Sequence, residues 1–509
     1  MAPGLLLLVA ALAFPGPTAA QQQVAQGGEP LELTLERMVQ LTMESSYQVR
    51  FLDMGIQQRN LGLRAERARL RSSVSLDMTV PTFQSVSEEE FDSQLGRNII
   101  VRENSRRWEA QLSVRQPIII PWLGYPTNGY LSLNNRVYRD TQIDEDGEHN
   151  LTYYNRYFIR YTQPLFQPNG LRNSLEQAEL QLEDAEIDYL NDVIEIVDNA
   201  SDDYYELFEA AYEGVIGAAY VQNLERAASL AQTLIAANPG RSIELNQINV
   251  ELANAREDVQ SAATDFRLQA AQLRTRLNLA EGTPITLTPV IDLQPVSIDV
   301  TRATQFAMEL TPRLRQLDIQ QRENEIRLDE QEGRNAFRVD LEFTYGREMR
   351  DELFGQLWDE PSNTYTIDVN AFVPIWDWGE REARIESQRI NLRRTELQME
   401  QARIQIVSDV ENQVRTLEEL QARTLTMEQN LGLAASISQE SLELYANGTI
   451  TALDLLQSLR RELDTAENFL EAYTGWRGSL QRLQRLTFWD FEADVPVVDR
   501  YGITVATLQ

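Results

Sequence analysis

The stretch VPIWDWGEREARIESQ (373–388) changes abruptly from an alternating strand pattern to a charged helix pattern. Pro374 ends the hydrogen-bonding ladder because proline has no backbone N–H to donate. Gly379 permits the backbone turn that begins the helix. Trp376 and Trp378 lie between these two residues, where aromatic side chains are expected to mark the inner boundary of a membrane. The stretch therefore predicts a junction between sheet and helix.

A second junction of the same kind lies earlier in the chain. The stretch TQPLFQPNGLRNSLEQ (162–177) again carries a proline, Pro164, and a glycine, Gly170, between the two patterns. Segments 36–53 and 301–318 share seven identical residues at a constant spacing of 265, whereas the two junction prolines are 210 residues apart. The chain is therefore a duplicated unit, and its first half carries 55 additional residues between the first strand and the junction.

Each half is predicted to run helix, strands, long helix and return helix. The first repeat covers 21–278, with an opening helix at 33–71, strands within 74–166, a long helix at 171–237 and a return helix at 242–278. The second covers 301–486, with an opening helix at 301–335, strands at 339–373, a long helix at 380–446 and a return helix at 451–486. Residues 279–300 link the halves, and 487–509 form a C-terminal tail. The long helices lack proline and contain almost no glycine, so each would reach roughly 100 Å.

The first twenty residues have the pattern of a secretory signal peptide. An apolar run at 5–14 is followed by small residues at 18–20, which suit a cleavage site. A buried N-terminal helix is the alternative interpretation. No later run of 18 apolar residues occurs, so we expect an exported chain without a transmembrane helix.

Composition argues against covalent and metal chemistry. The chain has no cysteine, which excludes disulfides, thiolate metal sites and a lipid-anchoring cysteine. Its one histidine, His149, lies in the polar stretch DEDGEHN and is interpreted as a solvated loop residue. A net charge of −32 argues against nucleic acid as a partner. We therefore expect no enzyme activity, no catalytic residue, no metal site and no cofactor.

Six segments alternate between apolar and polar residues with the period of a strand. They are 74–80, 108–115, 131–137, 150–162, 339–345 and 365–373. Apolar side chains on one face and Asp, Glu, Thr or Arg on the other suit the wall of a lipid-facing barrel. A soluble antiparallel sheet with one face on a core gives the same alternation. Because about eight strands are the practical minimum for a barrel, closure would need several chains.

With these junctions, the duplicated plan and the glycine turn into TALDLLQS (451–458), the chain resembles the TolC-like outer-membrane efflux family over essentially its whole mature length. The resemblance implies a mainly α-helical fold with a membrane β region. A duplicated helix–strand–helix repeat would form a long coiled-coil barrel of helices, continuous with a twelve-stranded β-barrel built by a homotrimer. It also implies outer-membrane lipid around the strands, a periplasmic helical tunnel, a periplasmic adaptor protein and an inner-membrane pump.

The resemblance also places a gate at the periplasmic tip of the helices. The residues at the family's tip positions are Gly240, Glu244, Asn246, Tyr445, Gly448 and Asp454. Gln457 stands where the family has a second aspartate, so one ring of Asp454 carboxylates is implied rather than two. The alternative for Asp454 is an ordinary acidic residue near a helix start, where the helix dipole favours it.

The resulting hypothesis is a passive exit duct in the outer membrane of a Gram-negative-type bacterium, carrying small molecules or a secreted protein from a partner pump. A structural periplasmic coiled-coil scaffold without channel activity is the alternative. Four strands per chain would match the family, but this sequence has six. The extra ribbon, about 106–138, either enlarges the barrel or lies outside it as a flap.

Overall fold

The computed structural model describes residues 31–92, 96–120, 125–143, 149–237, 239–280 and 282–502, so the predicted signal peptide lies outside the described residues. The chain divides into two compact units. Of the described residues, those within 31–49, 196–296 and 415–482 form the helical unit. Those within 50–195, 297–414 and 483–502 form the sheet unit. Both halves of the duplicated sequence contribute to each unit.

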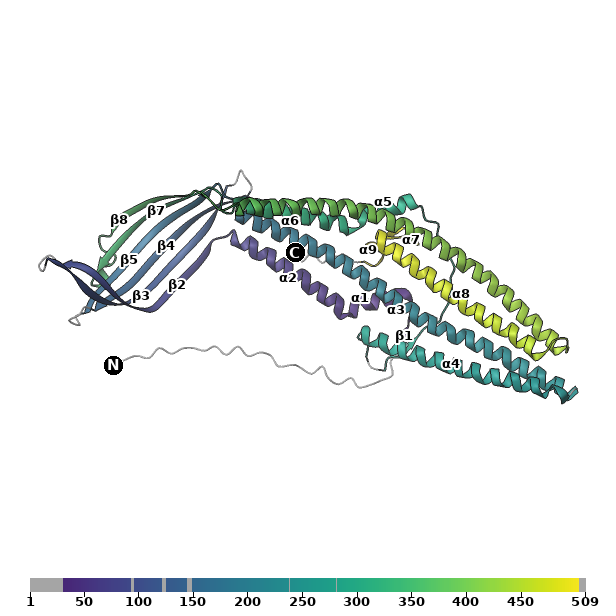
Figure 1. Cartoon of the computed structure of the whole chain (residues 1–509). Helices are drawn as coiled ribbons and strands as arrows, with labels where there is room; N and C mark the ends of the chain where they lie inside the picture. Colours follow the sequence, from purple (N-terminus) through teal and green to yellow (C-terminus); the bar gives the residue numbers. More distant parts are fainter. Residues whose placement is uncertain are drawn as a thin grey trace, which may run out of the picture. The chain divides into compact units, whose positions relative to one another are not determined.

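The sheet unit is organised around one antiparallel sheet of six strands (Figure 1). The strands are β2 (Ser73–Asp92), β3 (Arg97–Ile120), β4 (Tyr125–Ile143), β5 (His149–Leu165), β7 (Arg338–Asp351) and β8 (Ser362–Phe372). Their order in the sheet, β2-β3-β4-β5-β7-β8, is their order in the chain. His149 is the first residue of β5, opposite Ile143, so the prediction that it lies in a loop is wrong.

The two sequence spacings identify which strands are equivalent in the two halves. A spacing of 265 relates β2 to β7, and a spacing of 210 relates β5 to β8. The strands β3 and β4 have no counterpart in the second half, where β7 pairs directly with β8. They make up most of the 55-residue insertion, and they lie inside the sheet between β2 and β5.

The two faces of this sheet differ sharply in chemistry. On one face, large apolar side chains of the outermost strands are open to solvent in a single chain. Val74, Leu76 and Met78 on β2 are 60–68% exposed, and Tyr365, Ile367 and Val369 on β8 are 61–76% exposed. The opposite face carries arginine, aspartate and glutamate side chains that form ion pairs between neighbouring strands.

Each opening helix is divided in two, which corrects the prediction of single helices at 33–71 and 301–335. In the first half α1 (Leu35–Ser45) is followed by α2 (Tyr47–Arg69), and the hydroxyl of Ser46 accepts a hydrogen bond from the Gln48 N–H (3.1 Å). In the second half α5 (Val300–Leu310) is followed by α6 (Pro312–Gly333). Pro312 opens α6, because its missing N–H is tolerated only in the first helical turn.

The long helices are α3 (Gly170–Ala237) and α7 (Glu380–Ala446), and each has residues in both units. The return helices are α4 (Ser242–Arg276) and α8 (Ala452–Thr487). The return helices start within one residue, and end within two, of the boundaries expected from the sequence. Within the helical unit α3 and α4 form one antiparallel hairpin, and α7 and α8 form the other (Figure 1).

The chain's first described strand is tied to the linker between the halves. β1 (Leu31–Glu32) pairs in parallel with β6 (Ile285–Thr286) in the helical unit. Beneath this pair, Leu33 and Met38 pack with Leu207 of α3 and Leu273 of α4 in a buried cluster. The linker is therefore part of a folded region rather than a free connection.

The C-terminal tail folds back on the sheet unit through β9 (Trp489–Asp490), β10 (Val495–Pro496) and α9 (Val497–Arg500). The ring of Trp489 stacks on Phe306 of α5, with 4.0 Å between centroids. The fully buried carboxylate of Asp490 pairs with Arg500.

Of the described helices, none has an apolar stretch long enough to cross a membrane.

Candidate functional site

The α7–α8 hairpin turns at a glycine that the backbone requires. Gly448 has a φ of +75°, in the left-handed region, and its N–H donates to the Tyr445 carbonyl (2.9 Å). The next N–H, that of Thr449, donates to the Leu444 carbonyl (2.9 Å). These two bonds form a Schellman motif, in which glycine is preferred because a Cβ would strain the left-handed backbone. The turn therefore fixes where α7 ends.

Asp454 caps the start of the following helix. Its Oδ2 accepts hydrogen bonds from the Thr451 N–H (3.0 Å) and hydroxyl (2.7 Å), and the Asp454 N–H donates back to the Thr451 hydroxyl (3.3 Å). This reciprocal arrangement is a capping box. The Thr451 hydrogen bonds hold the pKa of Asp454 below its ordinary value, so this exposed carboxylate is ionised at neutral pH.

A polar cluster, which we call the tip cluster, joins the two hairpins next to these turns. It consists of Arg241, Glu244 and Tyr445. Glu244 accepts hydrogen bonds from Arg241 Nε (3.0 Å) and from the hydroxyl of the fully buried Tyr445 (3.0 Å). The Arg241 guanidinium also lies 5.5 Å from the centroid of the Tyr445 ring and donates to the Ile450 carbonyl (3.3 Å).

The environment of Tyr445 keeps its hydroxyl protonated. Burial first, and then the hydrogen bond to Glu244, raise the pKa of Tyr445 to about 12. The phenol therefore acts as a donor across the whole physiological pH range. The Glu244 carboxylate therefore accepts one hydrogen bond from each half of the chain, from Arg241 in the first half and from Tyr445 in the second.

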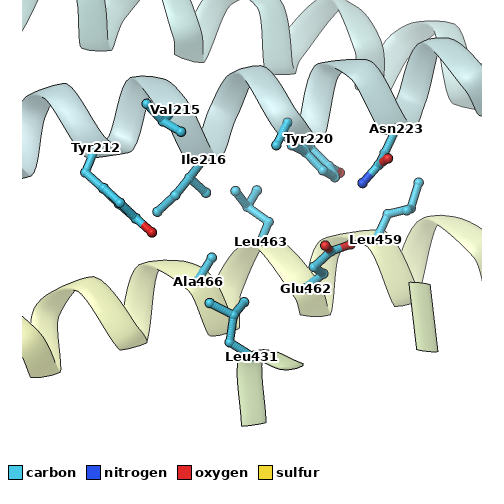
Figure 2. A pocket seen from close by; sticks show the side chains of 11 residues that line it. Tyr212, Val215, Ile216, Tyr220, Asn223, Leu431, Leu459, Glu462, Leu463 and Ala466 are labelled. Atoms are coloured by element: carbon cyan, nitrogen blue, oxygen red, sulfur yellow. The ribbon is translucent and has the colours of Figure 1, made fainter. Parts of the chain in front are cut away.

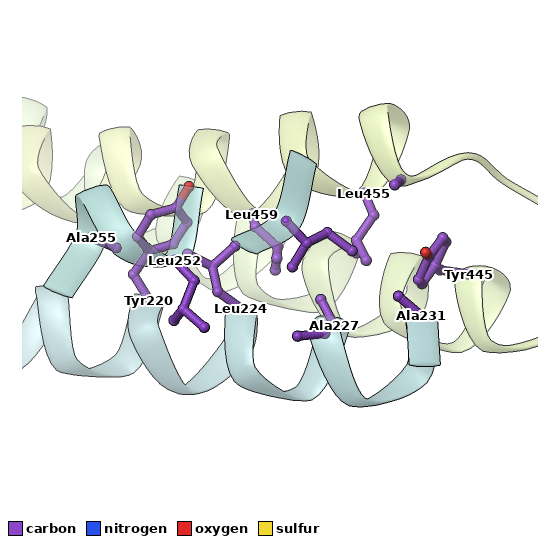
Figure 3. Close-up of a cluster of buried hydrophobic side chains, with 12 residues drawn as sticks. Tyr220, Leu224, Ala227, Ala231, Leu252, Ala255, Tyr445, Leu455 and Leu459 are labelled. Carbon is purple, nitrogen blue, oxygen red and sulfur yellow. The ribbon is translucent and has the colours of Figure 1, made fainter. Parts of the chain in front are cut away.

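An apolar core lies directly beneath the tip cluster (Figure 3). Leu455 and Leu459 of α8 are fully buried against Leu224 and Ala227 of α3, and Tyr445 closes one end of this core. Small alanines on α3 allow the helices to approach closely, as ridge-into-groove packing requires. The core binds the two hairpins together, and the tip cluster caps it.

A second polar contact joins three helices farther from the turns. Glu251 of α4 accepts hydrogen bonds from the Tyr220 hydroxyl on α3 (2.8 Å) and from Arg460 on α8 (2.8 Å). Burial and the Glu251 hydrogen bond raise the pKa of Tyr220. Tyr220 also borders a cavity of about 170 Å³ between α3, α7 and α8, lined mainly by apolar side chains such as Ile216 and Leu463 (Figure 2).

Residues 311–487, which contain the second junction, α7 and the tip of the second hairpin, match the sequence model of the outer membrane efflux protein family. The chain carries an outer membrane efflux protein domain. This finding confirms the family resemblance read from the junction and the glycine turn. No curated protein matches the chain.

Solved outer-membrane channels have the same fold over nearly the whole chain. The CmeC outer membrane channel of Campylobacter jejuni superposes with a TM-score of 0.65 at 11% identity, covering 98% of this chain and 98% of its own. The outer membrane protein VceC of Vibrio cholerae gives 0.62 at 14%, covering 89% and 96%. The open MtrE outer membrane channel of Neisseria gonorrhoeae gives 0.61 at 13%, covering 89% and 88%. The predicted fold class, a TolC-like duplicated helix–strand–helix repeat, is confirmed.

The structure places the expected tip residues in three different settings. Tyr445 and Glu244 are in contact, and Gly448 and Asp454 form the turn and cap of the efflux protein domain. Gly240 lies in the 3-10 helix Pro239–Arg241, and Asn246 is exposed on α4. Among the described residues, no three histidine, aspartate or glutamate side chains are placed to hold a metal ion.

Sequence reasoning missed Arg241, which connects the two hairpins. A usable signal was present, because Arg241 precedes Glu244 by three residues at a helix start and is the only basic residue in the turn NPGRSIEL. Its contact with Tyr445, about two hundred positions away, depends on tertiary structure and could not be read from spacing.

The second strand-to-helix junction lies within the efflux protein domain and has two left-handed residues. Trp378 has a φ of +58° and Gly379 a φ of +82°. Asp377, which sequence reasoning missed, caps α7 by accepting the N–H groups of Gly379 (3.0 Å) and Arg381 (3.1 Å). Trp376 and Trp378 contact each other edge to face and are 74% and 89% exposed.

The first junction also has a left-handed residue between strand and helix, but at a different kind of residue. Pro164 still pairs with Asp340 near the end of β5, and the left-handed residue that follows is Phe166, with a φ of +62°. Gly170 begins α3 with no left-handed backbone, and a Cβ there would meet no atom within 4 Å. At this junction the left-handed turn is therefore made by Phe166 rather than by Gly170.

Proposed function

We propose that this protein is a passive exit duct in the outer membrane, which conducts substrates delivered by a partner pump. Three copies close a barrel with their sheets, and their long helices continue it as a tunnel through the periplasm. The substrate is a small molecule or a secreted protein, since one duct serves either kind of cargo.

The observation that carries this proposal is the two-faced sheet. Its apolar face exposes Leu76, Tyr365 and Ile367 by 60–76%, whereas Arg136 pairs with Glu109 (2.8 Å) on the opposite face. A soluble protein that exposes so many large apolar side chains together would need a partner surface. Outer-membrane lipid provides that surface, and the polar face then lines an aqueous lumen.

Asn135, Asn155 and Tyr157 lie on the apolar face and hydrogen-bond to one another within the chain. Asn135 donates to the Asn155 side-chain carbonyl (2.8 Å), and Asn155 donates to the Tyr157 hydroxyl (2.8 Å). Asn155 is fully buried by these neighbours. Such pairing matters because lipid offers no hydrogen bonds in exchange.

The exposed Trp376 and Trp378 support a membrane boundary at the junction between β8 and α7. Indole rings favour the interface between lipid and water because they combine an apolar ring with an N–H donor. In this proposal the two tryptophans, with Pro374 and Gly379, mark the periplasmic edge of the barrel.

The tip cluster acts as the periplasmic gate. The two hairpins are held together by the Tyr445–Glu244 hydrogen bond and by the contacts of Arg241 with the Tyr445 ring and the Ile450 carbonyl, so opening requires these contacts to break. Asp454 and Gly448 lie at the same end and face solvent at the duct's periplasmic mouth. A periplasmic adaptor protein docks at these turns and connects the duct to an inner-membrane pump.

Single-channel recording in planar bilayers tests the proposal. Purified protein reconstituted in lipid is expected to show discrete, cation-favouring conductance steps, since the chain is strongly acidic. A protein that extracts without detergent and conducts no ions under any condition would instead be a periplasmic scaffold, and the duct would be refuted.

A further inference from the structure

The insertion that distinguishes the first half pairs along most of its length with the strands on both sides. β3 pairs with β2 from Ser73↔Arg115 to Asp92↔Arg97, with a single irregularity between Thr79 and Thr82. β4 pairs with β5 from Tyr130↔Thr162 to Ile143↔His149 without interruption. A flap that left the wall would free one of these edges, so the pairing places the β3–β4 hairpin within the wall.

The hairpin also continues both faces of the sheet. On the polar face it brings its own counter-charges, because Arg136 on β4 pairs with Glu109 on β3 (2.8 Å), and Arg107 on β3 with Asp140 on β4 (3.4 Å). On the apolar face Leu112, Leu131 and Leu133 are 45–54% exposed, in line with the neighbouring strands.

Contacts on the polar face extend from the hairpin into the strands shared by both halves. The ring of Tyr138 on β4 stacks on Tyr154 of β5, with 4.6 Å between centroids, and Arg350 of β7 donates to the Tyr138 hydroxyl (3.2 Å). Tyr154 in turn donates to Glu348 of β7 (2.6 Å). Three adjacent strands, β4, β5 and β7, therefore share one contact network.

The two outer edges of the sheet fit a second copy of this chain. Within the described residues β2 pairs only with β3, and β8 only with β7. Because six antiparallel strands alternate in direction, β8 of one copy runs antiparallel to β2 of the next. Inserting a whole hairpin preserves this alternation, whereas one added strand would break it. Both edge strands carry the exposed apolar side chains that a continuous lipid-facing wall needs.

We propose that the β3–β4 hairpin is a structural part of the barrel wall, so that each copy contributes six strands and three copies close an eighteen-stranded barrel. The inference rests on the proposed duct and specifies the size of its cargo. Barrel diameter grows roughly linearly with strand number, so the lumen is about 1.5 times as wide as that of a twelve-stranded barrel. The outer-membrane segment of this duct admits solutes of correspondingly larger cross-section.

The chain supplies its own shortened variant for a test. The turn at 352–361 in the second half corresponds to 87–151 in the first, so replacing 87–151 by a second copy of 352–361 gives both halves a two-strand hairpin. The removed ion pairs lie within the hairpin, so none of these charges is left unpaired.

Polymer exclusion measures the result. Polyethylene glycols of graded size are added at the sheet side of the reconstituted full-length channel and of the shortened variant. We expect the largest polymer that enters the full-length channel to be about 1.5 times wider than the largest that enters the variant. An equal cut-off overturns the proposal. A full-length protein that conducts no ions refutes the duct itself, which is a distinguishable outcome.

A labelling experiment decides the question if the shortened variant does not assemble. Because the chain has no cysteine, single cysteines can be labelled without background. A fluorophore at Leu112→Cys on β3 should be quenched by nitroxide lipids as strongly as one at Ile367→Cys on β8. A label at Gln111→Cys, on the polar face, is the unquenched control. Quenching at Ile367→Cys without quenching at Leu112→Cys would overturn the proposal.

Discussion

The two halves of this chain follow one plan but differ at both of its ends. At the sheet, the first half has four strands and the second has two. At the turns, the first half uses the 3-10 helix Pro239–Arg241, and the second uses a Schellman motif at Gly448 followed by a capping box. The parts that the two halves share determine the architecture, and the parts in which they differ give each half its own role.

At the turns, the first half contributes charged side chains, whereas the second half contributes a buried aromatic ring and a left-handed turn. The first half provides Arg241 and Glu244, whereas the second provides the buried ring of Tyr445 and the left-handed turn. Neither half can make the tip cluster alone. Two identical repeats would lack this contact, so the hairpins are joined by residues that differ between the two halves.

Alanine substitution at the two turn glycines should give the largest contrast. Gly448→Ala forces a Cβ into the left-handed region and is expected to destabilise the turn by about 1–2 kcal/mol. Gly240→Ala, in a 3-10 helix, is expected to change stability by less than about 0.5 kcal/mol. Hydrogen exchange at the amides near each turn measures both. Equal effects would show that the two turns are conformationally alike.

Removing the Tyr445 hydroxyl should loosen the tip cluster. Tyr445→Phe keeps the ring packed but deletes the hydrogen bond to Glu244, at a cost of about 1 kcal/mol, so basal conductance should rise several-fold. In the unmodified protein the contribution of this hydroxyl is complete below its ordinary pKa and is lost as the pH rises through about 12.

Tyr220→Phe is the matched control for Tyr445→Phe. It also deletes a tyrosine–glutamate hydrogen bond within the same unit, but farther from the turns. It should lower thermal stability without raising conductance. A similar rise in conductance for both variants would remove the tip cluster from its proposed gating role.

Ion pairs inside and outside the insertion should contribute similarly to the stability of the sheet. Arg136 pairs with Glu109 within the hairpin (2.8 Å), and Arg160 on β5 pairs with Glu342 on β7 (3.1 Å). Because all four side chains are partly exposed, double-mutant cycles with alanine should give coupling energies of up to about 1 kcal/mol for each pair. A coupling confined to Arg160 and Glu342 would indicate that the hairpin is not packed as the wall is.

Substitution of Asp454 should have the smallest effect on the channel. Its helix-capping role and its charge can be tested separately. Asp454→Asn removes the charge and should weaken block by divalent cations at the periplasmic mouth. Thr451→Ala removes the capping hydroxyl but keeps the charge, so it should leave that block unchanged. Block that is unaffected by Asp454→Asn would confine Asp454 to its helix-capping role.

Local patterns predicted much of the fold. The long helices were readable because few residues in 171–237 and 380–446 break a helix, and each of the six strands had its own alternation. The breaks at Ser46 and Thr311 were missed because the apolar pattern continues across them, although Pro312 was a signal for the second.

The position of the extra hairpin could not be predicted from the sequence. Alternation reveals that 108–115 and 131–137 are strands, but the partner of each strand depends on pairing between segments distant in the chain. For the same reason the contact between Arg241 and Tyr445 could not be predicted, although the family resemblance named Tyr445 as a tip residue. Local chemistry gave the elements, and only the tertiary structure gave their neighbours.

Counting the strands of the assembled protein tests the central claim most directly. An electron cryomicroscopy map of the channel in lipid nanodiscs should resolve a continuous wall with six strands per copy, β2 of one copy lying beside β8 of the next. A wall with four strands per copy, and residues 97–143 outside it, would contradict the account.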